Sequence, residues 1–195
     1  MEIEIKRQII HAMGIFTIIP IYILGNFYAS LLFLATSVFF LFFGEYRKNK
    51  AKYKILKSKK IDEFEEVVED EFKSYERSRE LPFQGVITFL LGAFVVTLLF
   101  QTSIAVASIA LLAMADSLST VVGRYFGRRK LPINKKKTWE GSITFFLAGF
   151  VTLLFFIDPL RAVIIALVAT LVEMMPIAED NVTVPLATAL LLFFL

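Results

Sequence analysis

The 195-residue chain is 57% apolar, contains 21 phenylalanines and no cysteine, and carries a formal net charge of +3 at pH 7. Soluble domains are usually about half apolar at most, so this composition excludes an ordinary soluble globule and favours a helix bundle immersed in lipid. The lack of cysteine excludes disulfides and thiolate metal sites. We therefore expect one all-α integral membrane domain over residues 1–195.

Apolar segments of nearly membrane-spanning length recur along the whole chain. They lie at about 8–25, 26–43, 82–100, 102–122, 142–157, 159–176 and 182–195. A spanning helix needs roughly 17–25 residues, so the short fifth and seventh segments could instead be half-buried or re-entrant. The sequence thus predicts a polytopic transmembrane helix bundle of about seven spans, with six as the alternative. No small-residue cleavage site ends the first segment, so we expect a retained span rather than a signal peptide.

Basic residues gather in three regions between these segments. Lys6 and Arg7 precede the first segment, the range 44–81 holds eleven Lys and Arg, and 123–141 holds seven. Tight connections make neighbouring spans antiparallel hairpins, which brings all three regions to one side of the membrane. Because cytoplasmic loops carry an excess of Lys and Arg, we expect the N-terminus and these loops in the cytoplasm.

The segment 44–81 mixes its eleven basic residues with ten acidic ones, and apolar residues recur in it at helical spacing. This pattern predicts one cytoplasmic, charged amphipathic helix. The helix could lie on the bundle or on the membrane surface, or it could cover the site as a lid.

Asp116 stands inside the fourth apolar segment, where it follows fourteen uncharged residues. An ionisable side chain at the centre of a span costs about 2.5–3.5 kcal/mol, so such a residue is a candidate for function. The alternative is a structural partner for a neighbouring arginine. We expect Asp116 to be catalytic, near the cytoplasmic end of its helix.

The region 116–142 combines glycines and basic residues between two carboxylates. Glycine lets backbone N–H groups approach phosphate oxygens, and arginine binds phosphate through two parallel bonds. The alternative is a loop that anchors to anionic lipid headgroups. We expect a cytoplasmic nucleotide-binding region here. Its candidate residues are Gly123, Arg124, Gly127, Lys136, Lys137, Thr138, Glu140 and Gly141.

A second acidic group follows in the last third of the chain, and the hairpin count returns it to the face of Asp116. Carboxylate and amide oxygens suit Mg²⁺, which takes a few carboxylates together with substrate phosphates. The predicted metal ligands are Asp116, Glu173, Asp180 and Asn181. Asp180 or Asn181 could instead cap the seventh helix. Further candidates at this face are Arg7, His11 and Glu45, although a lone histidine such as His11 could equally be a packing residue.

Three motifs resemble one family of membrane enzymes. The string Asp-x6-Gly-Arg-x2-Gly from Asp116, with Lys-Thr-Trp-Glu-Gly-Ser from Lys137, resembles the CTP-dependent lipid-alcohol kinases: polyprenol and dolichol kinase, phytol kinase and the yeast-type diacylglycerol kinase. Glu-x2-Pro-x3-Asp-Asn-x-Thr-Val-Pro from Glu173 is similar to their C-terminal motif, and Arg7-x3-His11 resembles their opening. The run Lys-Lys-Thr-Trp-Glu-Gly also resembles the phosphatidate cytidylyltransferases.

The chain departs from the family pattern at two positions. The lysine that follows the opening arginine in the family is Gln8 here, which puts that phosphate contact in doubt. The residue before Asp116, usually glycine in the family, is Ala115. No Gly-x4-Gly-Lys-Ser/Thr motif occurs, so an ordinary P-loop is excluded.

The resemblance implies transfer of the γ-phosphate of CTP to a polyprenol- or dolichol-type isoprenoid alcohol, or a related lipid hydroxyl, at the cytoplasmic membrane face. It also implies Mg²⁺, with Asp116 holding the metal or accepting the hydroxyl proton. One alternative is a phosphatidate-type cytidylyltransferase that makes a CDP-lipid. A membrane transporter is a second alternative, against which the one-sided charge argues. We expect the lipid alcohol, CTP and membrane lipids as partners and no nucleic acid, and so small a bundle could pair with itself as a homodimer.

Overall fold

The computed structural model describes residues 2–48, 82–176 and 179–195, and within these ranges the fold is all-α, as the sequence predicts. The helices, in chain order, are α1 Glu2–Met13, the 3-10 helix η1 Gly14–Thr17, α2 Ile18–Lys48, α4 Gln84–Leu99, α5 Thr102–Tyr125, α6 Trp139–Leu153, α7 Pro159–Met174 and α8 Asp180–Phe194. Of the amphipathic helix predicted over 44–81, residues 44–48 continue α2 and the rest lies outside the described ranges.

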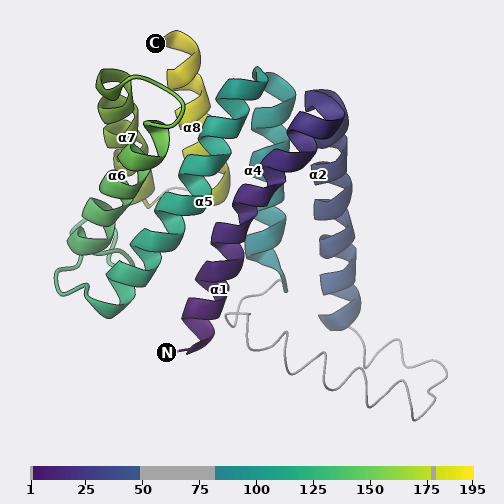
Figure 1. Cartoon of the computed structure of the whole chain (residues 1–195). Coiled ribbons are helices and arrows are strands. Elements are labelled where there is room, and N and C mark those ends of the chain that lie inside the picture. Colours follow the sequence, from purple (N-terminus) through teal and green to yellow (C-terminus); the bar gives the residue numbers. More distant parts are fainter. Residues whose placement is uncertain (1, 49–81, 177–178) are drawn as a thin grey trace.

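The first helical stretch reverses direction at Gly25. This residue has φ 77° and ψ 164°, a backbone conformation that glycine adopts without steric penalty because it has no Cβ. In Figure 1, α1, η1 and the start of α2 rise from the N-terminus, and the rest of α2 descends beside them. The predicted boundary between the first two apolar segments falls at this residue.

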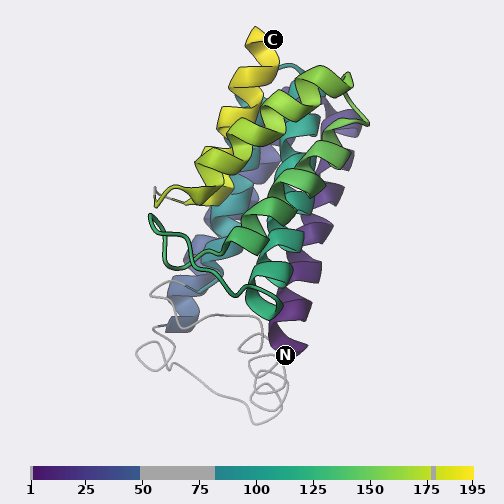
Figure 2. The same cartoon turned by 90° about the vertical axis from the view of Figure 1, so that its left-hand side faces the viewer.

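Helix α5 lies at the centre of the bundle and contacts α1, α2, α4, α6 and α8. Its residues 105–113 are all buried, and small side chains such as Ala105, Ala107 and Ala113 are 0–1% exposed. Small residues let helix backbones approach closely, which is the usual way in which helices pack in a membrane. Figure 2 shows α6 and α7 as a hairpin against this core, with the end of α7 coming down beside the loop at residues 126–138.

Polar contacts tie the turns at the end of the bundle away from the N-terminus. The Asn26 side chain donates to the Phe100 carbonyl and accepts from the Thr102 hydroxyl, both at 2.7 Å, so the turn after Gly25 is joined to the α4–α5 turn. Arg161, which lies outside the three basic regions of the sequence, pairs there with Asp158 at 3.3 Å. The N-terminus, the end of α2 and the 126–138 loop all lie at the opposite end (Figure 1).

Two helical stretches in the described part of the chain are long and apolar enough to cross a membrane, Ile5–Arg47 and Thr102–Tyr125. The first of them contains the reversal at Gly25. Helices α4, α6 and α8 are apolar but shorter. The predicted count of about seven spans therefore stays a prediction.

Candidate active site

A cavity of about 1370 Å³ opens at the end of the bundle that holds the N-terminus and the 126–138 loop. Sites for one drug-sized ligand usually measure roughly 300–1,000 Å³, so this cavity has room for more than one small molecule. Most of the residues singled out from the sequence line it: Arg7, His11, Asp116, Gly123, Arg124, Gly127, Lys136, Lys137, Thr138, Gly141, Glu173, Asp180 and Asn181. Glu45 and Glu140 are not among its lining residues.

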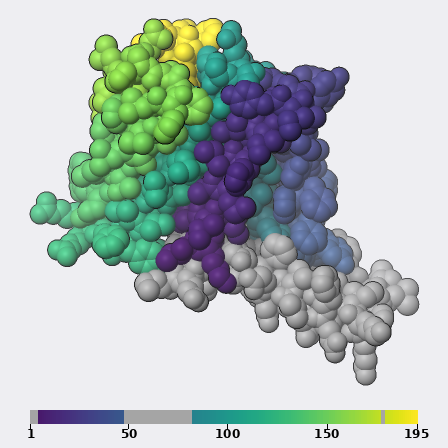
Figure 3. Space-filling view, viewed as in Figure 1, coloured from purple at the N-terminus to yellow at the C-terminus, as the bar shows by residue number. Residues whose placement is uncertain are grey.

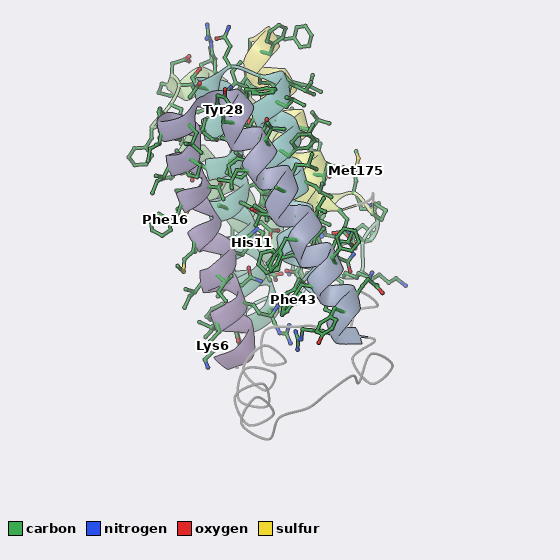
Figure 4. All side chains as sticks on the ribbon, turned by 90° about the vertical axis from the view of Figure 1, so that its right-hand side faces the viewer. Lys6, His11, Phe16, Tyr28, Phe43 and Met175 are labelled. Atoms are coloured by element: carbon green, nitrogen blue, oxygen red, sulfur yellow. The ribbon has the colours of Figure 1, made fainter. Side chains whose placement is uncertain are left out.

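Asp116 and His11 face each other across the cavity, from α5 and α1. The Asp116 Oδ2 lies 3.3 Å from His11 Nε2, and the two side chains are 19% and 16% exposed. Nε2 has no aligned hydrogen-bond partner among the described residues. Figure 4 shows His11 pointing into the bundle, whereas Phe16, five residues further along the same helical stretch, points away from it. The Asp116 carboxylate is therefore in contact with a histidine without being locked to it.

Lys137 joins two of the other carboxylates of the cavity, Glu173 and Asp180. Its Nζ donates to Glu173 Oε1 and to Asp180 Oδ2, both at 2.7 Å. Glu173 is only 4% exposed, and its second oxygen accepts a 3.3 Å hydrogen bond from the Ser142 hydroxyl. Burial by itself lowers the pKa of Lys137, but the two carboxylates outweigh it and leave that pKa above its usual value. Lys137 is therefore a fixed positive charge.

The four predicted metal ligands do not converge into a cage. The Asn181 amide donates to the Gly85 carbonyl at 3.3 Å and to Thr88 Oγ1 at 2.9 Å, which fastens α8 to α4. Glu173 and Asp180 surround the Lys137 ammonium, and no group of three acidic or histidine side chains in the described ranges is placed to hold a metal ion. A single carboxylate such as that of Asp116 still suits Mg²⁺, because this ion commonly takes one or two carboxylates and completes its shell with substrate phosphates.

The loop that carries Lys136 and Lys137 has a defined backbone. The Leu131 N–H donates to the Lys137 carbonyl at 3.1 Å, the Trp139 N–H donates to the Arg129 carbonyl at 3.0 Å, and the Leu131 side chain is fully buried. Both oxygens of Glu140 accept from the Arg129 N–H, at 3.3 and 3.4 Å. Glu140 thus supports the loop from outside the cavity, a role that its spacing in the sequence did not indicate.

The three predicted phosphate-binding glycines lie where α5, the loop and α6 meet. A Cβ on Gly123 would come within 2.9 Å of Thr138 Oγ1, one on Gly141 within 3.1 Å of the Ser119 carbonyl oxygen, and one on Gly127 would collide with the Gly123 carbonyl oxygen. Thr138 also caps α6 by accepting from the Gly141 N–H at 3.2 Å. These glycines permit close packing of the protein with itself, and phosphate binding by them stays a prediction.

Ser142 and Phe89 are among the cavity residues that were not predicted from the sequence. Ser142 ends the Lys-Thr-Trp-Glu-Gly-Ser string, so its position carried a signal, and it holds Glu173. Phe89 carried none, because it is one of 21 phenylalanines. Its ring stands edge-on to His11 with a centroid distance of 5.3 Å.

Comparison with known proteins agrees with the motifs. No family model and no solved structure matches the chain. Over 140 residues, 62% of this chain, it is 34% identical to a probable chloroplastic phytol kinase of Triticum aestivum, of which the match covers 47%. The chloroplastic phytol kinase 1 of Arabidopsis thaliana is 33% identical over 58% of this chain and 44% of its own length, and the chloroplastic farnesol kinase of that plant is 36% identical over 49% and 36%.

The chain thus spans less than half the length of these relatives. The curated phytol and farnesol kinases that it matches are 31–37% identical to it. The resemblance to the family of phytol, farnesol and polyprenol-type kinases that the motifs indicated is therefore confirmed.

Proposed function

We propose that this protein is a lipid-alcohol kinase that transfers the γ-phosphate of CTP to the hydroxyl of an isoprenoid alcohol. The observation that carries the proposal is the position of Asp116, which lines a cavity with cations on one side and apolar side chains on the other. The cations Lys136 and Arg124, which both line the cavity, suit the nucleotide phosphates. The apolar residues, Phe40 and Leu90 among them, suit a hydrocarbon chain. The names of the relatives support the same acceptor class.

The reaction needs positioning and charge stabilisation more than covalent chemistry by the protein. The alcohol oxygen bonds to the γ-phosphorus, the bond from that phosphorus to the β–γ bridging oxygen breaks, and CDP leaves. Asp116 accepts the hydroxyl proton or holds Mg²⁺, which would neutralise charge on the nucleotide phosphates. Lys136, exposed on the loop, and Arg124, in the last turn of α5, approach the phosphates from the open side.

We further propose that the chain is a multi-pass membrane protein with its N-terminus and site in the cytoplasm. Large apolar side chains stand open on the outside of the bundle, for example Ile23, Phe42, Leu160 and Phe155 at 70–83% exposure. A surface of this kind is typical of contact with lipid. The N-terminal segment, which holds Lys6 and Arg7, and the basic 126–138 loop lie at the same end as the cavity (Figure 1), which fits the excess of Lys and Arg on the cytoplasmic side.

The deciding experiment is an assay with CTP labelled on the γ-phosphate and a panel of lipid alcohols that includes phytol, farnesol and a long polyprenol. We expect the label in the extracted lipid, and weaker transfer from ATP. If the label is released as pyrophosphate while a label on the α-phosphate enters a phosphatidate acceptor, the protein is a cytidylyltransferase instead.

A further inference from the structure

The cavity has two sides that differ in chemistry and come mostly from different helices, with α1 contributing polar residues as well as apolar ones. Its polar side is formed by α5, the 126–138 loop and the start of α8, with Asp116 and Lys137 among its residues. Its apolar side is formed by α1, α2 and α4, with Met13, Phe40 and Leu90 among its residues. A cavity of this composition suits a molecule with a polar head and a long apolar chain.

Phe89 lies at the junction of the two sides. Its side chain is 6% exposed, and its ring stands edge-on to His11, whose Nε2 lies 3.3 Å from Asp116. The ring also packs against Gly14, three residues beyond His11, where an added Cβ would come within 2.5 Å of the Phe89 Cζ. Phe89 therefore fills the space between the Asp116–His11 pair and the apolar side of the cavity. It has room there because Gly14 carries no side chain.

The apolar side of the cavity opens between α1 and the part of α2 that follows Gly25. Helix α1 packs on α5 and α2 packs on α4, so α1 and α2 separate from the turn at Gly25 towards the other end of the bundle (Figure 1). The space-filling view shows a strip of α4 between the purple surface of α1 and the blue surface of α2 (Figure 3). Ile10 of α1 and Phe40 of α2 both line the cavity, and Ile10 is 45% exposed.

We propose that the hydrocarbon chain of the acceptor alcohol enters sideways between α1 and α2 and lies along α4, and that Phe89 determines which chains are accepted. This inference rests on the proposed function, because it takes the hydroxyl to sit beside Asp116. The first carbons of the alcohol then pass the Phe89 ring, and the width left by Phe89 and Gly14 selects among chains. One methylene in an apolar pocket changes specificity about 10- to 200-fold, so a change of ring size at this position has a measurable effect.

The first test uses Phe89→Leu in the full chain and compares kcat/KM for phytol, whose chain is mostly saturated and flexible, with that for farnesol. We expect the ratio to change by about tenfold or more. The matched control is Phe94→Leu, on the same helix but not in the cavity lining, which leaves the ratio unchanged. An unchanged ratio in Phe89→Leu overturns the role of Phe89.

A second variant tests the Gly14 contact. We expect Gly14→Ala to raise KM for the alcohol several-fold while KM for the nucleotide stays constant, and Phe89→Leu in the same chain to restore it, because the smaller side chain accommodates the new Cβ. If the two substitutions act independently, Gly14 and Phe89 do not jointly set the width.

The binding path is tested without catalysis. A farnesol analogue that carries a diazirine is irradiated with the protein in lipid nanodiscs, without nucleotide, and labelled peptides are mapped by mass spectrometry. We expect labels in α1 and α4 that excess phytol suppresses, and labels confined to α6 and α7 overturn the path. If the protein is labelled in α1 and α4 yet phosphorylates no alcohol, the proposed kinase function fails while the path stands. If the protein has normal kinase activity but is labelled elsewhere, the kinase function stands and the path fails.

Discussion

The two groups of carboxylates in the cavity differ in how their charge is balanced. Glu173 and Asp180 share the Lys137 ammonium at 2.7 Å each, and Ser142 holds the remaining oxygen of Glu173. Among the described residues, the one ion-pair contact of Asp116 is with His11, at 3.3 Å and without an aligned hydrogen bond. Both groups line the same cavity.

This difference indicates that one group of carboxylates has a structural role and the other a role in the reaction. A buried ion pair that is fully hydrogen-bonded fixes geometry, and removing one partner leaves an uncompensated charge. A carboxylate whose neighbour is not locked to it can change partners, which a proton acceptor or a metal ligand must do. We therefore expect substitutions at Lys137 to act mainly on stability and substitutions at Asp116 mainly on turnover.

The largest effect is expected for Asp116→Asn. The amide keeps the shape of the side chain but cannot accept the hydroxyl proton, and kcat for γ-phosphate transfer should fall about 10²- to 10⁴-fold. The melting temperature in detergent should stay close to that of the wild type. Near-normal turnover in this variant would show that Asp116 is structural and would remove the main support for the mechanism.

The next effect concerns the ion-paired side chains of Lys137, Glu173 and Asp180, which form the locked group. Lys137→Met leaves Glu173 and Asp180 without their cation and should lower the free energy of unfolding by ~3 kcal/mol, measured by thermal or denaturant unfolding in detergent. Lys137→Met combined with Glu173→Gln should recover part of this loss, because one of the carboxylates is then neutral. Equal stability of the single and double variants would contradict the account of Lys137 as a counter-ion.

A smaller effect is expected where α4 crosses α8, next to the locked group. A Cβ at Gly92 would collide with the Asn181 carbonyl oxygen, so Gly92→Ala should destabilise the protein by about 1–3 kcal/mol. Gly85→Ala on the same helix is the control, because a Cβ there meets nothing within 4 Å. If both variants melt at the same temperature, α4 and α8 do not cross as closely as the structure has them.

A modest effect is expected at the contact between His11 and Asp116. His11→Gln should lower kcat about 2- to 10-fold with little change in melting temperature, because a contact that is poorly aligned without substrate can tighten during turnover into a hydrogen bond of about 0.5–1.5 kcal/mol. When Asp116 is already Asn, the same substitution should have no further effect on turnover. Additive losses in the double variant would mean that His11 acts independently of Asp116.

The smallest effect is on pH dependence. Because the folded-state pKa of Lys137 lies above 10.5, its contribution to stability is complete below that value and declines only as pH rises through the folded pKa. The stability difference between the wild type and Lys137→Met should therefore be constant from about pH 7 to pH 9. A difference that disappears within this interval would show that Lys137 is not held charged.

Hydrophobic periodicity and basic loops predicted the helices and the end of the bundle where the site lies, because these depend on one-dimensional patterns. The reversal at Gly25 and the gathering of Asp116, Lys137 and Glu173 around one cavity agree with those predictions. The functional roles given to these residues stay predictions.

Side-chain pairing could not be predicted in this way. Hairpin counting places Glu173, Asp180 and Asn181 at one end but does not say that Lys137 lies between the first two or that Asn181 turns to α4. The same holds for Glu140, which points out of the cavity to the Arg129 N–H. The separation of α1 and α2 depends on which helices they pack against, and no local pattern records that.

The Asn26 tie at the far end gives the first hairpin a mechanical property. Its hydrogen bonds to the α4–α5 turn hold the chain beside Gly25, so a tilt of the rod formed by α1, η1 and the start of α2 would pivot near that point. His11 lies fifteen residues away, about 22 Å along a helix at 1.5 Å per residue. A tilt of one degree at the pivot therefore moves His11 by about 0.4 Å, and the rod acts as a lever whose long arm ends at the Asp116 carboxylate.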